Sequence, residues 1–108
     1  MSVRGVIGLA IIVATADAER LHMALRLAAS HAALGGRTRL LLDDVAVPAV
    51  QIGGALLESC FELGAEIILC QSGMAAVGLE AGALDGRLQF GGMVSFLAQL
   101  ENDRLVVV

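Results

Sequence analysis

The sequence predicts an α/β protein with about five mainly parallel strands flanked by helices. Two observations lead to this class. Short, almost continuous apolar runs alternate along the chain with longer segments in which apolar residues recur every three or four positions. Continuous runs are typical of strands buried on both faces of a parallel sheet, and the longer spacing is typical of helices that pack on such a sheet. With 108 residues, the chain has the length of one domain with one core.

The chain begins with a predicted strand and a long helix. Residues 6–14 are apolar at nearly every position and predict a strand at the centre of the sheet. Thr15 or Asp17 can cap the helix that follows, and Gly35-Gly36 should end it. The apolar stripe of this helix consists of Leu21, Leu25, Ala28 and Ala32.

The next segments predict a second strand and a second helix. Residues 39–42 predict a second buried strand that Asp43-Asp44 should stop. The stretch from there to Pro48 is expected to be a loop. Gly53-Gly54 precedes a helix, and Gly64 lies where the residue after its end belongs. The apolar stripe of this second helix is Leu56, Leu57, Cys60, Phe61 and Leu63.

The last third of the chain continues the alternation. Glu66–Cys70 predicts a third strand, and the remaining elements are a short helix at 73–77, a strand at 88–91, a helix at 93–100 and a strand at 105–108. In open parallel sheets, binding sites form in the loops that leave the carboxyl ends of strands. Here these loops are residues 15–19, 43–51, 71–74 and 91–93.

The composition favours self-association. Hydrophobic residues make up 57% of the chain, Tyr, Trp and Lys are absent, and the net charge is only -4. A small domain cannot bury so many apolar side chains in a single core, so part of its surface is expected to be covered by other subunits. We therefore expect a homo-oligomer.

Charge and hydropathy exclude two other classes. The seven Arg residues are scattered singly, whereas a nucleic-acid surface needs clustered positive charge. No uncharged stretch exceeds the 13 residues that 45–57 and 67–79 have, and a membrane-spanning helix needs ~18. The N-terminus superficially resembles a signal peptide, but its apolar run is rich in β-branched residues and lacks a convincing cleavage site. We interpret it as the start of a mature cytoplasmic chain.

The sequence predicts neither a cofactor nor a metal. The loop at 14–19 lacks the glycines that cradle phosphate and carries the carboxylates of Asp17 and Glu19, so no nucleotide or flavin is expected. His22 and His31 are nine residues apart, which places them on nearly opposite faces of one helix. No C-x-x-C or H-x-x-x-H spacing supports a zinc site.

Cys70 is the main candidate functional residue. It ends a predicted strand, and the supporting loop Gln71, Ser72, Gly73 and Met74 leads into a short helix. Backbone N–H groups and the helix dipole at such a corner favour the thiolate, so Cys70 is a candidate sulfur nucleophile. The alternative is that Cys70 packs as a small buried hydrophobe.

Other residues at the same end of the sheet are candidates for a pocket around Cys70. These are Thr15, His22, Gly92 and Met93. Each also has a simpler explanation, because His22 can be an exposed helix histidine and the methionines at 74 and 93 can be core residues. Asp43 and Asp44 are interpreted as solvated turn formers.

Two segments of this chain resemble the DsrE-like branch of the DsrE/DsrF-like family. Residues 67–79 place a cysteine after a strand, a Met four residues later and a Gly-hydrophobic pair after that. Residues 90–97 match the glycine-led final helix of the family, rich in small and apolar residues. The helix at 56–65 fits as well, and the similarity is strongest from residue 54 to residue 108.

The resemblance implies a fold and a function. The fold is a flavodoxin-like three-layer sandwich formed by one domain, residues 1–108, and assembled into trimers or hexamers. The function is sulfur relay, in which the matching Cys70 accepts a sulfane sulfur as a persulfide and passes it to a partner protein. The loop Gln71-Ser72-Gly73 has no Arg or Lys to hold an anionic donor such as thiosulfate, so independent small-molecule catalysis is not expected.

Two alternatives to sulfur relay stay open from the sequence. In the first, the protein is a non-catalytic interaction or regulatory subunit in which Cys70 is structural. In the second, it binds a small molecule in the clefts between subunits.

Overall fold

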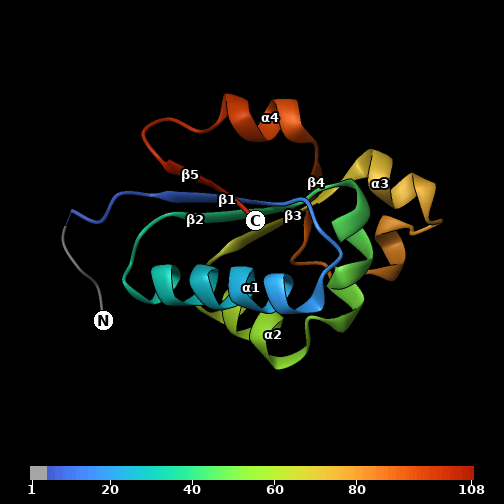
Figure 1. Cartoon of the computed structure of the whole chain (residues 1–108), viewed down its shortest axis with the longest axis horizontal. Helices are drawn as coiled ribbons and strands as arrows, with labels where there is room; N and C mark the ends of the chain where they lie inside the picture. Colours follow the sequence, from blue (N-terminus) through green and yellow to red (C-terminus); the bar gives the residue numbers. More distant parts are fainter. Residues whose placement is uncertain (1–4) are drawn as a thin grey trace.

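A single parallel sheet forms the centre of the protein. The computed structural model describes residues 5–108, and helices lie on both faces of its five-stranded sheet (Figure 1). The predicted α/β class and three-layer sandwich are therefore confirmed, and the sheet is entirely parallel. In the sheet order β4-β3-β2-β1-β5, the strands are Gln89–Gly91, Glu66–Cys70, Thr38–Leu42, Leu9–Val13 and Arg104–Val107.

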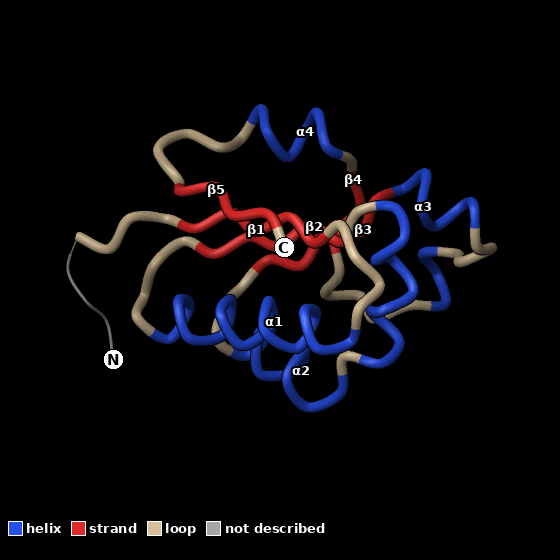
Figure 2. The backbone as a smooth tube through the Cα atoms, in the orientation of Figure 1, coloured by secondary structure: helices blue, strands red, loops and turns tan. Residues whose placement is uncertain are grey.

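The order of the strands explains which helices lie on which face. From β1 to β4 the chain always moves toward the same edge, so right-handed crossovers put α1 (Ala18–Ala33) and α2 (Gly54–Glu62) on one face. The step from β4 to β5 runs the other way, and α4 (Met93–Ala98) therefore lies on the opposite face (Figure 2). Flavodoxin itself has the strand order 2-1-3-4-5, so the likeness is one of layers.

The two faces of the sheet have cores of very different size. Leu9, Ile11 and Val13 alternate along β1 toward α1 and α2, where they join the larger cluster of buried side chains. Ala10 and Ile12 point the other way, into a small cluster that Phe96 of α4 closes, with Met93 packed against it. Because α4 has 6 residues, it covers its face of the sheet incompletely.

The predicted elements are all present, with several bounds changed. The strand expected at 88–91 begins at Gln89, the short helix expected at 73–77 is Gln71–Ala76, and the strand expected at 105–108 is Arg104–Val107. The strand expected at 6–14 is limited to Leu9–Val13, because its neighbours begin pairing only at Thr38 and Arg104. The helix expected at 93–100 ends at Ala98. Gly35 and Gly64 follow their helices with φ of 86° and 90°, as expected of residues that end a helix in the left-handed region.

The expectation of a loop after the second strand was wrong. Residues Asp44–Ile52 form a 3₁₀ helix, η1, that contains Pro48. Its first turn is closed by a hydrogen bond of 2.9 Å from Ala46 N to Asp43 O, and Ala46 and Val47 are fully buried beneath it. The burial of these two side chains fixes a segment whose local sequence, with a proline inside, does not specify a helix.

A second 3₁₀ turn, η2 (Ala81–Ala83), and the helix α3 (Gln71–Ala76) lie between β3 and β4.

Within residues 5–108, no single helix is long and apolar enough to cross a membrane. The helices η1 and α2, bent by 95° relative to one another, meet the length and composition test only when taken together. Residues 1–4, which belong to the expected domain and to our interpretation of the N-terminus, lie outside the described residues.

Candidate thiol site

The carboxyl ends of β2, β3 and β4 bring the candidate residues to one edge of the sheet. Cys70 is the last residue of β3 and pairs in register with Gly91 of β4. Leu42 pairs with Leu69. The residues that follow these two, Asp43 and Cys70, therefore lie level with one another. The helix η1 starts at Asp44 and packs against α3, which starts at Gln71. Cys70 thus sits between two helices that begin beside it.

The sulfur of Cys70 is largely buried and has a polar partner. The residue is 6% exposed and belongs to the larger core cluster. Its Sγ lies 3.2 Å from Oγ of Ser72, whose residue is exposed in the first turn of α3. A thiolate only accepts hydrogen bonds, so in the ionised site the Ser72 hydroxyl is the donor.

The surroundings favour the ionised form of Cys70. Burial raises the pKa of the thiol, but hydrogen bonds from the Ser72 hydroxyl and from backbone groups of Asp44 and Gly73 together lower it by more, so the pKa lies below its usual value. The negative charge of Asp43 acts in the opposite direction and limits the shift. The site therefore stabilises a thiolate with neutral donors.

A close backbone approach holds these donors in place. A Cβ at Gly73 would lie 2.8 Å from Val47 Cγ2 and 3.0 Å from Asp44 O, distances that packed atoms do not reach. Only glycine therefore lets the first turn of α3 contact η1 so closely. Asp44 has a positive φ of 42°, a conformation that Asp tolerates better than most residues. Gly73 and Asp44 are thus positioning residues for the sulfur.

Cys60 has the opposite environment. It is 0% exposed on α2, and its S–H donates to Leu25 O at 3.3 Å. Burial raises the pKa of Cys60, although a backbone hydrogen bond from Ala29 partly opposes this. Both cysteines are free thiols. The chain therefore carries one thiol in a thiolate-stabilising environment and one in an apolar environment.

The supporting loop divides into polar and packing residues. Gln71 and Ser72 are exposed at the start of α3, while Gly73 is buried. Met74 is only 6% exposed and belongs to the larger core cluster, which fits the simpler explanation of this methionine as a core residue.

The four residues named for a wider pocket lie in separate places. Thr15 Oγ1 accepts a hydrogen bond of 3.1 Å from Asp17 N at the start of α1. His22 is exposed and lines a shallow groove between α1 and the η1–α2 junction, beside Ile52. Gly92 caps α4, and Met93 packs against the small cluster beneath that helix. Of these residues, none is a hydrogen-bond partner of the Cys70 sulfur.

The histidines and carboxylates do not converge. His31 Nε2 donates to Ile7 O at 2.8 Å, and its Nδ1 lies 2.7 Å from Thr38 Oγ1. His31 therefore ties the end of α1 to the starts of β1 and β2, at the amino-terminal edge of the sheet. Across the described part of the chain, no three His, Cys, Asp or Glu side chains are grouped so that they could hold a metal ion.

Sequence reasoning missed one contributor to the site. Asp44 was treated only as a turn former, yet its backbone lowers the pKa of Cys70 and contacts Gly73. Strand register could have revealed this contribution. Leu42 and Leu69 are aligned in β2 and β3, and Asp43-Asp44 follows the first while Cys70 follows the second.

Comparison with known proteins adds no assignment to this geometry. The chain matches no protein-family model and no curated protein sequence.

Proposed function

We propose that this protein carries sulfane sulfur as a persulfide on Cys70 and passes it to a partner protein. The observation that carries the proposal is the contrast between the two thiols. Ser72, Asp44 and Gly73 lower the pKa of Cys70, whereas burial raises that of Cys60. A thiolate at neutral pH is the species that attacks sulfur. The resemblance to DsrE-like proteins supports the same residue.

The proposed cycle consists of two thiol exchange steps. The Cys70 thiolate attacks the outer sulfur of a donor persulfide, forming a new S–S bond on Cys70 while the donor leaves as a thiolate. An acceptor thiolate then attacks that outer sulfur and releases the Cys70 thiolate. Each step forms one S–S bond and breaks one, so no external oxidant or reductant is needed.

The charges near Cys70 favour a protein donor over a small anion. Residues 43–51 and 71–78 contain no Arg or Lys, and Asp43 exerts a negative potential on the sulfur. Anions such as thiosulfate need a cationic or donor-rich cradle for their charge. A persulfide presented by another protein brings its own environment to the site. We therefore propose donor and acceptor proteins as the partners.

Intact-mass spectrometry after incubation with a persulfide-loaded carrier protein of different mass tests this function. The wild-type chain should gain the mass of one sulfur atom, and Cys60→Ser should gain the same. Cys70→Ser should gain none, and incubation with an excess of a second thiol should return the wild type to its original mass. Equal loading of Cys70→Ser, or no loading of the wild type, contradicts the proposal.

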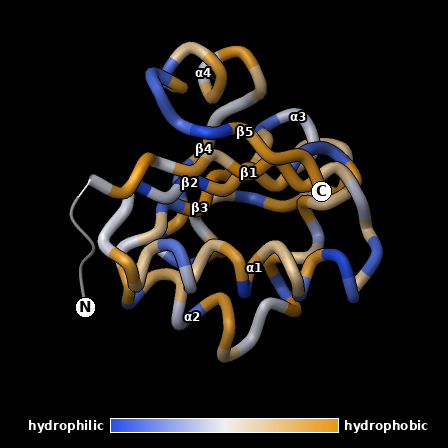
Figure 3. The backbone as a smooth tube through the Cα atoms, turned by 60° about the vertical axis from the view of Figure 1, so that its left-hand side comes forward, coloured by the Kyte–Doolittle hydropathy of each residue, from blue (hydrophilic) through white to orange (hydrophobic). Residues whose placement is uncertain are grey.

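We also propose that the protein is a homo-oligomer, trimeric or hexameric, assembled through the face that α4 covers incompletely. Leu105 and Val107 pair in register with Ala10 and Ile12, so their side chains point to the α4 face. They are nevertheless 44% and 65% exposed. Strand β5 and parts of α4 are coloured as hydrophobic in Figure 3.

Two more apolar side chains are exposed on α4. Ser95 and Gln99 line a pocket next to β3 and β4, so Leu97, on the other flank of α4, is turned toward β5, whereas Val94, about 160° around the helix from buried Phe96, points outward. Val94 is 84% exposed and Leu97 41%. We call Val94, Leu97, Leu105 and Val107 the α4–β5 strip. Apolar side chains left this exposed on a small domain are typical of surfaces that pair with another chain.

A second candidate function is a non-catalytic oligomeric subunit in which Cys70 is structural. The observation that favours it is the 6% exposure of Cys70. Alkylation by iodoacetamide at neutral pH separates the two functions, because a structural thiol reacts at the slow rate of Cys60 and an activated one reacts faster than free cysteine. For either function, two free thiols fit a reducing compartment, so we propose a cytoplasmic location.

A further inference from the structure

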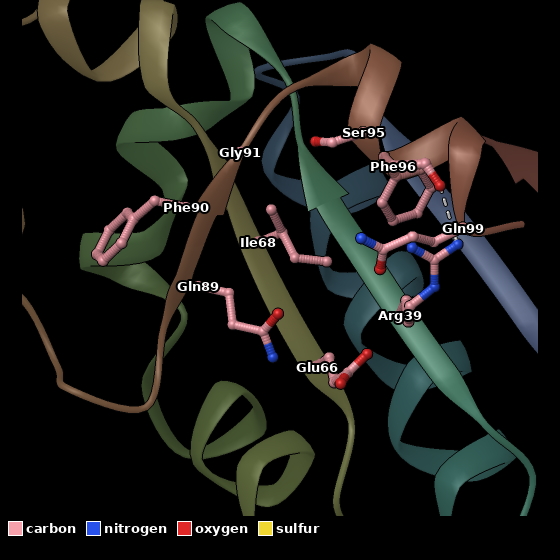
Figure 4. Close-up of a pocket in the computed structure, with 9 residues that line it drawn as sticks. All are labelled: Arg39, Glu66, Ile68, Gln89, Phe90, Gly91, Ser95, Phe96 and Gln99. Atoms are coloured by element: carbon pink, nitrogen blue, oxygen red, sulfur yellow. Dashed lines mark hydrogen bonds between the residues drawn. The ribbon is translucent and has the colours of Figure 1, made fainter.

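A pocket of about 70 Å³ opens on the α4 face, away from the cluster that holds the Cys70 sulfur. Figure 4 shows Glu66 and Gln89 projecting from β3 and β4 on one side, with Arg39, Phe96 and Gln99 on the other. The lining is mostly polar, although it lies directly against the sheet. Such a site is unrelated to the proposed sulfur chemistry.

Arg39 is the unusual residue of this pocket. It lies in the middle of the sheet on β2 and is 2% exposed, which is rare for arginine. Its Nη2 donates to Phe96 O at 3.1 Å, and the guanidinium stacks 4.3 Å from the centre of the Phe96 ring. Nε is buried without a hydrogen-bond partner among the described residues and lies 3.9 Å from Asp103 Oδ2, outside the pocket. Nη2 is the only guanidinium nitrogen found bonded among those residues, so Nη1 is the donor that remains for the pocket.

Glu66 supplies the opposite charge without pairing with Arg39. The two residues are register partners on β2 and β3, so their side chains leave the same face of adjacent strands. The acceptor carbonyl and ring of Phe96 draw the guanidinium toward α4 instead, and the carboxylate of Glu66 stays exposed. The guanidinium thus lies near Phe96 and Asp103, whereas the carboxylate of Glu66 lines the same pocket from the neighbouring strand without pairing with it (Figure 4).

Gly91 keeps the pocket open. A Cβ at this position would lie 3.2 Å from Ser95 Oγ and 3.6 Å from Ile68 Cγ2, and all three residues line the pocket. The amides of Gln89 and Gln99 add neutral donors and acceptors on both sides. Since liquid water occupies about 30 Å³ per molecule, the space suits a ligand of only a few heavy atoms.

We propose that this pocket binds a small zwitterion of the amino-acid class, with its carboxylate at Arg39 and its ammonium group at Glu66. A simple anion would be attracted by Arg39 but repelled by the carboxylate of Glu66. A simple cation would be attracted by Glu66 but repelled by Arg39. A ligand that carries both charges at opposite ends satisfies both residues. The charge-assisted hydrogen bonds at each end then select the zwitterion over either half alone.

Glycine, acetate and methylammonium are the probes that test this assignment. Each is titrated into the full-length, ¹⁵N-labelled protein while the backbone amide signals are followed by NMR. Glycine should shift the signals of Arg39, Glu66 and residues 89–91 in a saturable way. The affinities of acetate and methylammonium should each be lower than that of glycine by at least about tenfold, since each probe lacks one charge-assisted hydrogen bond.

Variants locate the site without disturbing the core. Glu66→Gln removes an exposed charge and should weaken glycine binding about tenfold. Glu62→Gln, an equally exposed carboxylate on α2, is the matched control and should bind like wild type. Gly91→Ala should weaken glycine binding by narrowing the pocket. The proposal is overturned if no saturable shift occurs at these residues, if either half-probe binds as tightly as glycine, or if Glu66→Gln behaves like Glu62→Gln.

Discussion

Ser72 follows Cys70 by two residues, and its Oγ lies 3.2 Å from the sulfur of Cys70. The contact is possible because β3 ends at Cys70 and α3 begins with the next residue, so the first turn of the helix folds back over the thiol. It is the only side-chain hydrogen bond among those that lower the pKa of Cys70. A single hydroxyl therefore adjusts the reactivity of the proposed sulfur acceptor.

Replacing Ser72 with Ala should slow the reaction of Cys70 with iodoacetamide. Loss of the donor raises the pKa of Cys70, so less thiolate is present at a given pH and the curve of rate against pH moves to higher pH. At pH 7 the rate should fall about fivefold, the equivalent of one hydrogen bond of about 1 kcal/mol. Ser59→Ala is the control, because Ser59 Oγ bonds Ala55 O within α2. An unchanged pH profile in Ser72→Ala would refute this role of the hydroxyl.

Gly73→Ala should destabilise the protein and disturb the thiol together. The added methyl group would lie 2.8 Å from Val47 Cγ2 and 3.0 Å from backbone atom O of Asp44, so α3 must move away from η1. We expect the free energy of unfolding, measured by urea denaturation, to fall by about 1–3 kcal/mol. Gly82→Ala meets no atom within 4 Å and should leave stability nearly unchanged. Equal stabilities of the two variants would contradict the close contact.

The buried pair of Arg39 and Asp103 should contribute strongly to the stability of the fold. Arg39 Nε lies 3.9 Å from Asp103 Oδ2, and both side chains are nearly inaccessible. Arg39→Met should reduce the free energy of unfolding by about 3 kcal/mol, because the buried carboxylate of Asp103 then loses the positive charge of the nearby guanidinium. The double variant Arg39→Met/Asp103→Asn should recover part of that loss. Additive effects in this double-mutant cycle would show that the two residues are not coupled.

Val94→Glu should reduce the size of the assembly. Val94 is 84% exposed, so a charge there does not disturb the fold of one subunit but does oppose burial of the α4–β5 strip. Light scattering coupled to size-exclusion chromatography should show oligomers for wild type and smaller species for the variant. Met23→Glu, on exposed α1 surface, should keep the wild-type mass. A monomeric wild type would refute the proposed assembly.

Several parts of the fold were predictable because local sequence determines them. Short continuous apolar runs are typical of strands covered on both faces, and the glycines at 35 and 64 end their helices in the left-handed region that few other residues adopt. The helix at Asp44–Ile52 was not predictable in this way, since burial of Ala46 and Val47 stabilises it against its own local preference.

The candidate site was predictable only in part. Cys70 and Ser72 are neighbours in sequence, so a strand-to-helix corner was enough to bring them together. Asp44 reaches the same sulfur from another element, and the pocket candidates His22 and Met93 lie away from it. Arg39 offered a signal that went unused, because a charged residue inside a buried strand requires a partner.

The sequence by itself determined the α/β class, the order of elements along the chain and the position of a cysteine at the end of a strand, because each depends on residues close together in the chain. Only the tertiary structure decided which backbone groups contact Cys70. The same holds for the unlike charges of Arg39 and Glu66 that line one pocket. The physical reason is that hydrogen bonds, desolvation and charge interactions depend on distances between strands and helices, and these are set by sheet register and by the direction of the crossovers.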